Sequence, residues 1–149
     1  MDNNNTNVIL VSASEQADII RAVLTWLNSY ENKPWKKVDY EYLGKTSGLC
    51  VSTVTAAFKT KQYITGGYKA QYQFQIVYRL IADDVDARIG ADEALNAMGE
   101  WCETDRTLAL PLGFYNAHVK RDTSASMVAR YDNNADDHAI SLTLTYEVI

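Results

Sequence analysis

The chain is poor in the residues that build disulfide scaffolds, metal centres and histidine-based active sites. It has two cysteines, Cys50 and Cys102, which are too few for a disulfide framework or a four-cysteine zinc site. Both lie in apolar patterns, and we expect both to be buried. The two histidines, His118 and His138, have no second ligand residue at a spacing typical of metal sites. We expect His138 to be an exposed edge residue at the start of the last strand.

Long apolar runs and basic tracts are also missing. No apolar stretch approaches the roughly 20 residues that a membrane-spanning helix needs, so we expect no membrane segment. Residues 1–7 are rich in asparagine and lack the basic start and apolar stretch of a signal peptide; we expect them to be flexible. Synthesis in a reducing cytoplasm fits these features best. A net charge of −5 without clustered lysine and arginine argues against a protein that grips nucleic acid.

Motifs for catalysis and cofactor binding are incomplete. Residues 43–46 look like the end of a phosphate-binding loop, but Asp39 stands where that loop needs a glycine, and a β-branched run follows instead of a helix. The acidic stretches 84–86 and 132–136 echo calcium loops without the glycine and glutamate that such loops need at positions six and twelve. We therefore predict no catalytic residue, no cofactor and no metal.

Charge is divided unevenly along the chain. Residues 1–82 contain nine basic and six acidic side chains, a net charge of +3, whereas residues 83–149 contain five basic and thirteen acidic side chains, a net charge of −8. Two interpretations remain open. Either the charges are scattered over the surface, or identical subunits meet head to tail, positive surface on negative surface, as in a ring or a filament.

Hydrophobic periodicity predicts an α+β fold in a single domain, residues 1–149. Helical spacing predicts helices over about 14–30 and 83–102, the first preceded by a capping box of Ser12 and Glu15. Alternation and β-branched runs predict the strands 38–42, 49–55, 68–80, 114–121, 126–131 and 138–148, with 56–64 either extending the second strand or starting another. We expect a mostly antiparallel sheet with the two main helices packed on one face and a projecting β-hairpin.

The longest alternating segment, residues 68–80, would span about 40 Å at about 3.4 Å per residue, which is long for a domain of this size. The glycine pair before it predicts a hairpin turn. We expect this hairpin to project and to form a subunit contact through Tyr63, Gly66, Gly67, Tyr68 and Lys69. We also expect Tyr68→Asp to hinder assembly while leaving the monomer folded.

The order of these elements resembles a known family. A helix over 15–30 opens the chain. The strand 72–79 runs into the helix 87–102, which has Ala94 and Leu95 at its middle and Trp101 near its end. A closing hairpin, 129–138, leads to an alternating strand that reaches Tyr146. Together these features cover most of 14–149 and resemble the tail terminator proteins of tailed bacteriophages, also described as minor capsid or head–tail joining proteins.

The resemblance implies a small α+β subunit that assembles as a hexameric ring. Such a ring caps the tail tube, stops its polymerisation and joins it to the head, without catalysis. The implied partners are the tail tube protein and the head or neck connector proteins, with DNA passing through the ring without specific binding. The implied location is the virion, after synthesis in the cytoplasm of the bacterial host.

Two alternatives to a tail terminator remain open. One is another structural protein of a phage, acting in the neck, in head completion or in tube formation. The other is an enzymatic or small-ligand-binding α+β domain whose site is assembled from scattered polar residues.

Overall fold

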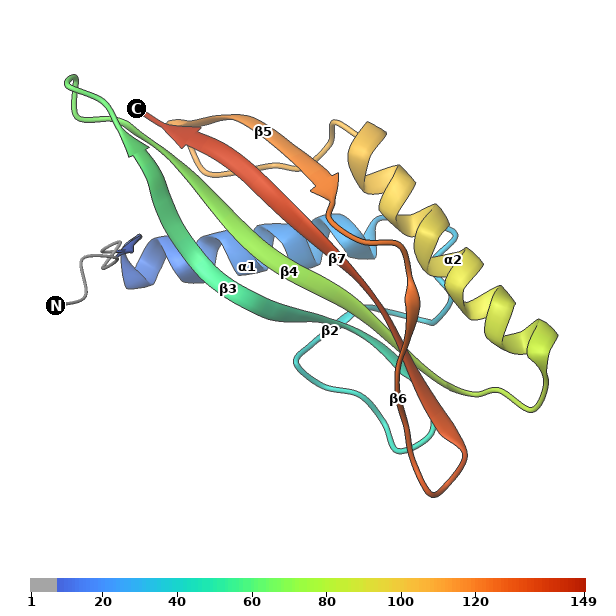
Figure 1. Ribbon diagram of the computed structural model, residues 1–149. Helices are drawn as coiled ribbons and strands as arrows, with labels where there is room; N and C mark the ends of the chain where they lie inside the picture. Colours follow the sequence, from blue (N-terminus) through green and yellow to red (C-terminus); the bar gives the residue numbers. More distant parts are fainter. Residues whose placement is uncertain (1–7) are drawn as a thin grey trace, which may run out of the picture.

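The computed structural model describes residues 8–149. Its elements follow one another as Figure 1 shows: β1 (Ile9–Leu10), α1 (Ala13–Asn28), β2 (Asp39–Tyr40), β3 (Gly48–Gln62), β4 (Tyr68–Ile81), α2 (Val85–Thr104), β5 (Phe114–Arg121), β6 (Ser126–Arg130) and β7 (Ala135–Val148). The flexibility expected for residues 1–7 lies outside the described residues.

The strands form one seven-stranded sheet. Its main order is β1-β3-β4-β7-β5, with β2 beside β3 and β6 beside β7. The β2–β3 pair is parallel and short, and the other pairs among residues 8–149 are antiparallel. The mostly antiparallel sheet predicted from the sequence is therefore confirmed.

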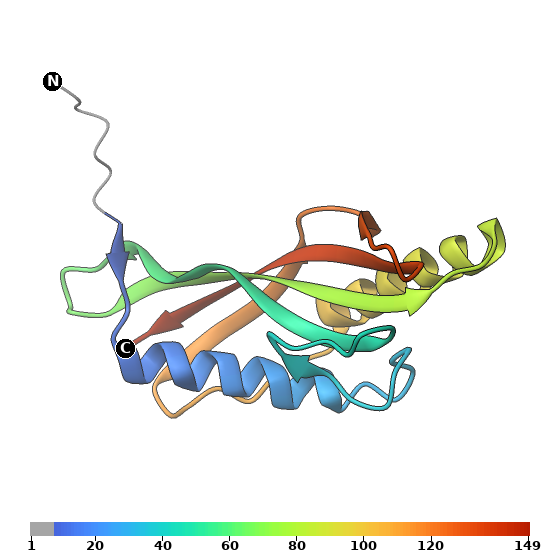
Figure 2. The same cartoon turned by 90° about the horizontal axis from the view of Figure 1, so that it is seen from below.

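Both helices cover the same face of the sheet, as predicted. The even-numbered residues of β4 from Tyr68 to Tyr78 and those of β7 from Ile140 to Val148 share one core with the apolar faces of α1 and α2. Where the helices meet, the indole of Trp26 stacks on that of Trp101, with ring centroids 4.9 Å apart. Figure 2 shows α1 running beneath the sheet, while no helix of residues 8–149 covers the opposite face.

Local sequence signals account for both helix starts. Ser12 Oγ accepts a hydrogen bond from the Glu15 amide at 3.2 Å, and Asp84 Oδ1 accepts one from the Ala87 amide at 2.8 Å. Each side chain therefore satisfies a backbone donor that has no partner within its helix.

The structure shortens one predicted strand and decides between the two alternatives left open for another. The strand expected over 38–42 is reduced to Asp39–Tyr40, because Glu41 takes a positive φ of 51° that turns the chain away. Residues 56–62 extend β3, with irregular pairing to β4 between Thr53 and Lys61. The prediction that Cys50 and Cys102 are buried is confirmed.

The prediction for His138 is wrong. Its side chain is 1% exposed, because β7 begins earlier, at Ala135, and lies between β4 and β6. The imidazole faces α2, where its Nδ1 lies 2.7 Å from Asp92 Oδ1. Its Nε2 has no hydrogen-bond partner among residues 8–149.

Candidate interface at the hairpin end of the sheet

The β3–β4 turn closes as a tight loop. The Tyr63 amide donates to the Gly67 carbonyl at 2.8 Å, and the Gly66 amide donates to the Tyr63 carbonyl at 3.0 Å. Gly66 takes a φ of +96°, in the region that glycine adopts without steric cost. Because Tyr68 pairs with Val148 near the end of β7, the turn lies beyond that strand, as Figure 1 shows.

Gly67 is required by a close approach rather than by its backbone angles. A Cβ atom at this position would lie 2.5 Å from the Val148 carbonyl oxygen. The absence of a side chain therefore allows the end of β7 to lie against the turn.

Three segments meet at this end of the sheet and expose aliphatic side chains. The Ile149 amide donates to the Gly113 carbonyl at 3.1 Å, which joins the last residue to the loop before β5. Ile64 and Leu112 are fully exposed, and Ile149 is 86% exposed. Single exposed aliphatic residues are common, but three from separate segments at one end are typical of an interaction surface.

We call this region the hairpin-end surface and define it as Lys61, Tyr63, Ile64, Leu112 and Ile149. Val8 and the two residues of the neighbouring β1, Ile9 and Leu10, are also exposed, and Ile9 pairs with Lys59 of β3. The sequence predicted the turn but not Leu112 or Ile149, because these two residues reach this end of the sheet through the pairing of β5 with β7 and not through local spacing. The signal available was Leu112 itself, an aliphatic residue placed between Pro111 and Gly113.

Tyr63 is held in place by a carboxylate of β7. Its hydroxyl donates to Glu147 Oε1 at 2.7 Å, and Asn116 Nδ2 donates to Glu147 Oε2 at 2.7 Å. These two hydrogen bonds, that of Asn116 first, hold the pKa of Glu147 below its ordinary value. The ring of Tyr63 therefore has a fixed orientation at the surface, with Lys61 Nζ 5.5 Å from its centroid.

Tyr68 belongs to the interior more than to the surface. Its hydroxyl donates to Glu15 Oε1, and Lys59 Nζ lies 4.3 Å from its ring centroid. Replacement by aspartate would remove this hydrogen bond and add a second negative charge to the partly buried surroundings of Glu15. We therefore expect Tyr68→Asp to destabilise the monomer, and not to leave it folded as the sequence alone led us to expect. Lys69, on the opposite face of β4, lies close enough to Glu147 to lower the pKa of that carboxyl further.

The outer edge of β3 is blocked by side chains. Gln16 of α1 binds the Ala57 backbone from both sides, since its Nε2 donates to the carbonyl at 2.7 Å and its Oε1 accepts from the amide at 2.9 Å. Glu41 Oε2 accepts from the Thr53 amide at 2.9 Å. These contacts occupy backbone groups that another strand would need for pairing.

The face without helices is polar along its middle. A shallow hollow of about 300 Å³ lies there, lined by Gln71, Gln73, His118, Lys120, Asp122, Thr143 and Thr145. These side chains come from β4, β5 and β7 and from the residue after β5. They offer hydrogen-bonding groups of both kinds to a second molecule.

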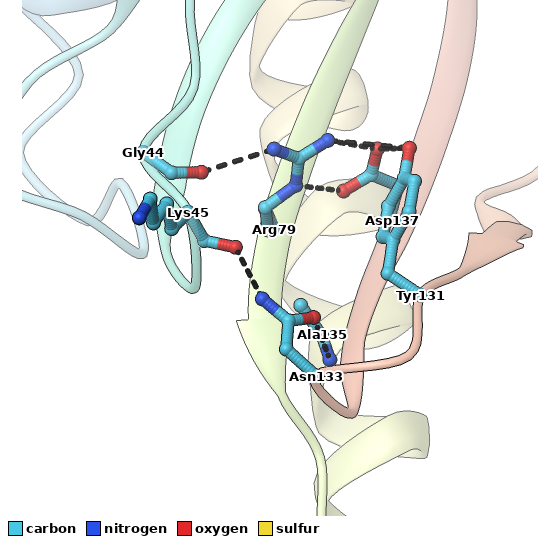
Figure 3. A network of polar contacts seen from close by, with 7 residues as sticks. All are labelled: Gly44, Lys45, Arg79, Tyr131, Asn133, Ala135 and Asp137. Carbon is cyan, nitrogen blue, oxygen red and sulfur yellow. Dashed lines mark hydrogen bonds and ion pairs between the residues drawn. The ribbon is translucent and has the colours of Figure 1, made fainter.

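The polar network of Figure 3 lies at the far end of this face. Arg79 binds Asp137 through two hydrogen bonds of 2.7 and 2.8 Å and donates to the Gly44 carbonyl at 3.0 Å. Tyr131 donates to the same carboxylate at 2.8 Å, and Asn133 donates to the Lys45 carbonyl at 3.1 Å. The hydrogen bonds to Asp137 raise the pKa of Arg79 above its ordinary value. The network therefore joins the loop before β3 to β4 and to the β6–β7 hairpin.

A second group of charges surrounds the buried Asp136 near the start of α2. Asp136 is fully buried and accepts from Arg130 Nε at 2.7 Å, and this hydrogen bond lowers the pKa of the carboxyl. Arg88 Nε lies 3.8 Å from the same carboxylate. These pairs, with His138 and Asp92, attach the start of α2 to the β6–β7 hairpin.

No group of three or more His, Cys, Asp or Glu side chains within 8–149 is arranged to hold a metal ion. The helices of this part of the chain are too short or too polar to cross a membrane. Neither a protein-family model nor a curated protein matches the chain.

Proposed function

We propose that the protein is a ring-forming structural subunit of the bacteriophage tail-terminator type. In this role, copies of the chain, six in the resembling family, surround the end of the tail tube, stop its polymerisation and carry the surface that joins the head. Helix α1, the long β4 running into α2, and the β6–β7 hairpin are the elements on which the sequence resemblance rests, and their presence supports the proposal.

The observation that carries this proposal is the hairpin-end surface. Its aliphatic side chains are exposed although β4 is paired along both sides and the β3 edge is blocked. Exposure of these side chains to water contributes no stability to the monomer. Their burial against another protein stabilises a complex by about 25 cal/mol per Å² of apolar area. A subunit that functions by assembly needs a surface of this kind.

Electron microscopy of the purified protein tests the ring. We expect closed rings with a central channel, sixfold in projection. In the phage that encodes the chain, deletion of its gene should give tails of uncontrolled length that do not join heads, and supplying the protein should restore them. A protein that stays monomeric at every concentration, together with normal tails in the deletion, would contradict the proposal.

Ligand binding on the helix-free face is the second candidate function. It is favoured by the hollow between β4, β5 and β7, where glutamine, threonine, histidine and lysine side chains converge. A monomeric protein that binds a small polar molecule there, and loses the binding on Gln73→Ala, would support this candidate against the ring.

A further inference from the structure

The opposite end of the sheet also exposes aliphatic side chains. At the start of α2, Val85 is 65% exposed and Ile89 is 59% exposed. They are four residues apart and therefore lie on one face of the helix. Ile81, the last residue of β4, is exposed beside them. We call this region the α2-end surface and define it as Ile81, Asp83, Val85, Asp86 and Ile89.

Helix capping does not account for this surface. One acidic residue, Asp84, caps α2, and an acidic first turn complements the helix dipole. Neither effect requires exposed valine or isoleucine. These β-branched residues lower helix propensity slightly, and their exposure to water does not stabilise the helix. The aliphatic pair is therefore unexplained by the fold of a single chain.

The two ends carry opposite charge. Around the α2-end surface, Asp83, Asp86 and Glu93 are exposed, and no ion pair engages them within 8–149. The hairpin-end surface includes Lys61, and two further lysines, Lys59 and Lys69, lie near it on β3 and β4. The carboxylate beside these lysines, Glu147, is already bound by Tyr63 and Asn116.

A single chain cannot bring the two surfaces together. They lie at the two ends of β4, whose 14 residues span about 45 Å at about 3.4 Å per residue. Figures 1 and 2 both show the β3–β4 turn and the start of α2 at opposite ends of the molecule. Contact between them requires a second copy of the chain.

We propose that the hairpin-end surface of one copy binds the α2-end surface of the next, aliphatic side chains against aliphatic side chains and lysines against aspartates. The inference rests on the proposed ring, for which it names the two contacting surfaces. A contact between different surfaces of identical chains propagates head to tail and closes into a ring when the rotation per subunit allows.

The structure also limits which basic residues of the chain can face the aspartates of the next copy. Lys45 precedes β3 and lies at the same end as the start of α2, since Asn133 of the β6–β7 hairpin binds its carbonyl. The basic partner of the aspartates is therefore the lysine group of the hairpin end alone, not the whole basic half of the chain.

Two blocking variants test the pairing. Ile64→Asp disables the hairpin-end surface, and Ile89→Asp disables the α2-end surface. Both side chains are exposed, so the monomer should keep its circular dichroism spectrum and melting temperature. We expect each variant alone to lose self-association by roughly 100-fold or more, because a buried interface would hold an unpaired carboxylate. Val54→Asp is the control, since Val54 is exposed at mid-length of β3.

Mixing the two blocked variants gives the decisive result. Each retains the surface that the other has lost, so an equimolar mixture should form a one-to-one dimer, seen by sedimentation velocity, that grows no further. Absence of this dimer would overturn the proposed pairing, as would normal assembly of either variant alone. If the wild-type chain itself never assembles, the proposed ring fails; if it assembles while both variants do too, only the surface assignment fails.

Discussion

The carboxylate of Glu15, in the first turn of α1, accepts a hydrogen bond of 2.7 Å from the hydroxyl of Tyr146 in the last strand. The two residues are 131 positions apart, and both are buried. Tyr68 of β4 donates to the other oxygen of the same carboxylate. One side chain therefore attaches α1 to the two central strands of the sheet, close to the hairpin-end surface.

Glu15→Ala should destabilise the protein by about 2–4 kcal/mol, since two tyrosine hydroxyls would lose their acceptor in a partly or fully buried position. Glu15→Gln should cost less, because its carbonyl oxygen still accepts one hydrogen bond. Glu31→Ala removes the same charge from an exposed position and should stay within about 0.5 kcal/mol of wild type. Urea unfolding of the three variants measures this order, and equal losses in Glu15→Ala and Glu31→Ala would contradict it.

Glu15 also marks the limit of what the sequence predicts. Ser12 and Glu15 form a capping-box pattern, in which the glutamate returns to the amide of the cap. Ser12 fulfils its part, but the Glu15 carboxylate binds two tyrosines from distant strands instead. The pattern predicted where the helix begins, because that depends on neighbouring residues. The tyrosine partners depend on the sheet order, which local spacing does not contain.

The strands that were predicted correctly depend on local patterns, and the errors arise where distant segments come into contact. Period-two alternation predicted β4 to within one residue, and the β6–β7 hairpin was recognised because its strands are neighbours in the chain. His138 was expected at an exposed edge, yet β4 pairs with β7 over its whole length and places the imidazole inside. The sequence named only part of the candidate interface for the same reason: the glycine turn is local, whereas Leu112 and Ile149 reach this end through the pairing of β5 with β7.

Alkaline pH should unfold the protein through its buried tyrosines. Burial, and then the hydrogen bond to Glu15, raise the pKa of Tyr68 and Tyr146 above the ordinary value of 10.0, and burial raises the pKa of Tyr72 to about 12. The unfolded chain then loses these protons at lower pH than the folded chain. The contribution of these tyrosines to the free energy of unfolding should therefore be constant below about pH 9 and fall as pH rises past about 10.

Thermal melts from neutral to alkaline pH measure this effect. Tyr146→Phe removes one of the shifted groups, so its stability should fall less steeply above about pH 10 than that of wild type, even though it starts lower. Identical slopes for the two proteins would show that Tyr146 ionises at the same pH in the folded and unfolded chains.

Two glycines should respond in opposite directions to alanine. Gly67→Ala places a Cβ 2.5 Å from the Val148 carbonyl and should cost about 1–3 kcal/mol, since the end of β7 must move away from the turn. Gly90 lies in an exposed turn of α2, where a Cβ meets nothing within 4 Å, so Gly90→Ala should stabilise the protein by up to about 1 kcal/mol. Denaturant midpoints compare the two, and a neutral Gly67→Ala would mean that the turn and β7 do not need their close contact.

Assembly should depend on salt in its rate more than in its final extent. If the lysines of the hairpin end meet the aspartates of the α2 end, their attraction steers the encounter of two copies. Exposed pairs contribute only about 0–1 kcal/mol each, so the aliphatic contacts carry most of the affinity. At 1 M salt the screening length falls to about 3 Å, and assembly from monomers should slow by about tenfold or more, while rings already formed persist.

Charge reversal makes the salt effect specific to the proposed pairing. Lys61→Glu and Asp86→Lys should each slow assembly at low salt, because each places like charges across the contact. A chain carrying both substitutions restores opposite charges at each contact and should recover most of the rate. Light scattering after dilution into low or high salt follows these rates. If the doubly substituted chain assembled more slowly than both single variants, Lys61 and Asp86 would not face each other across the interface. The uneven charge along the chain would then be a property of its exposed surface alone.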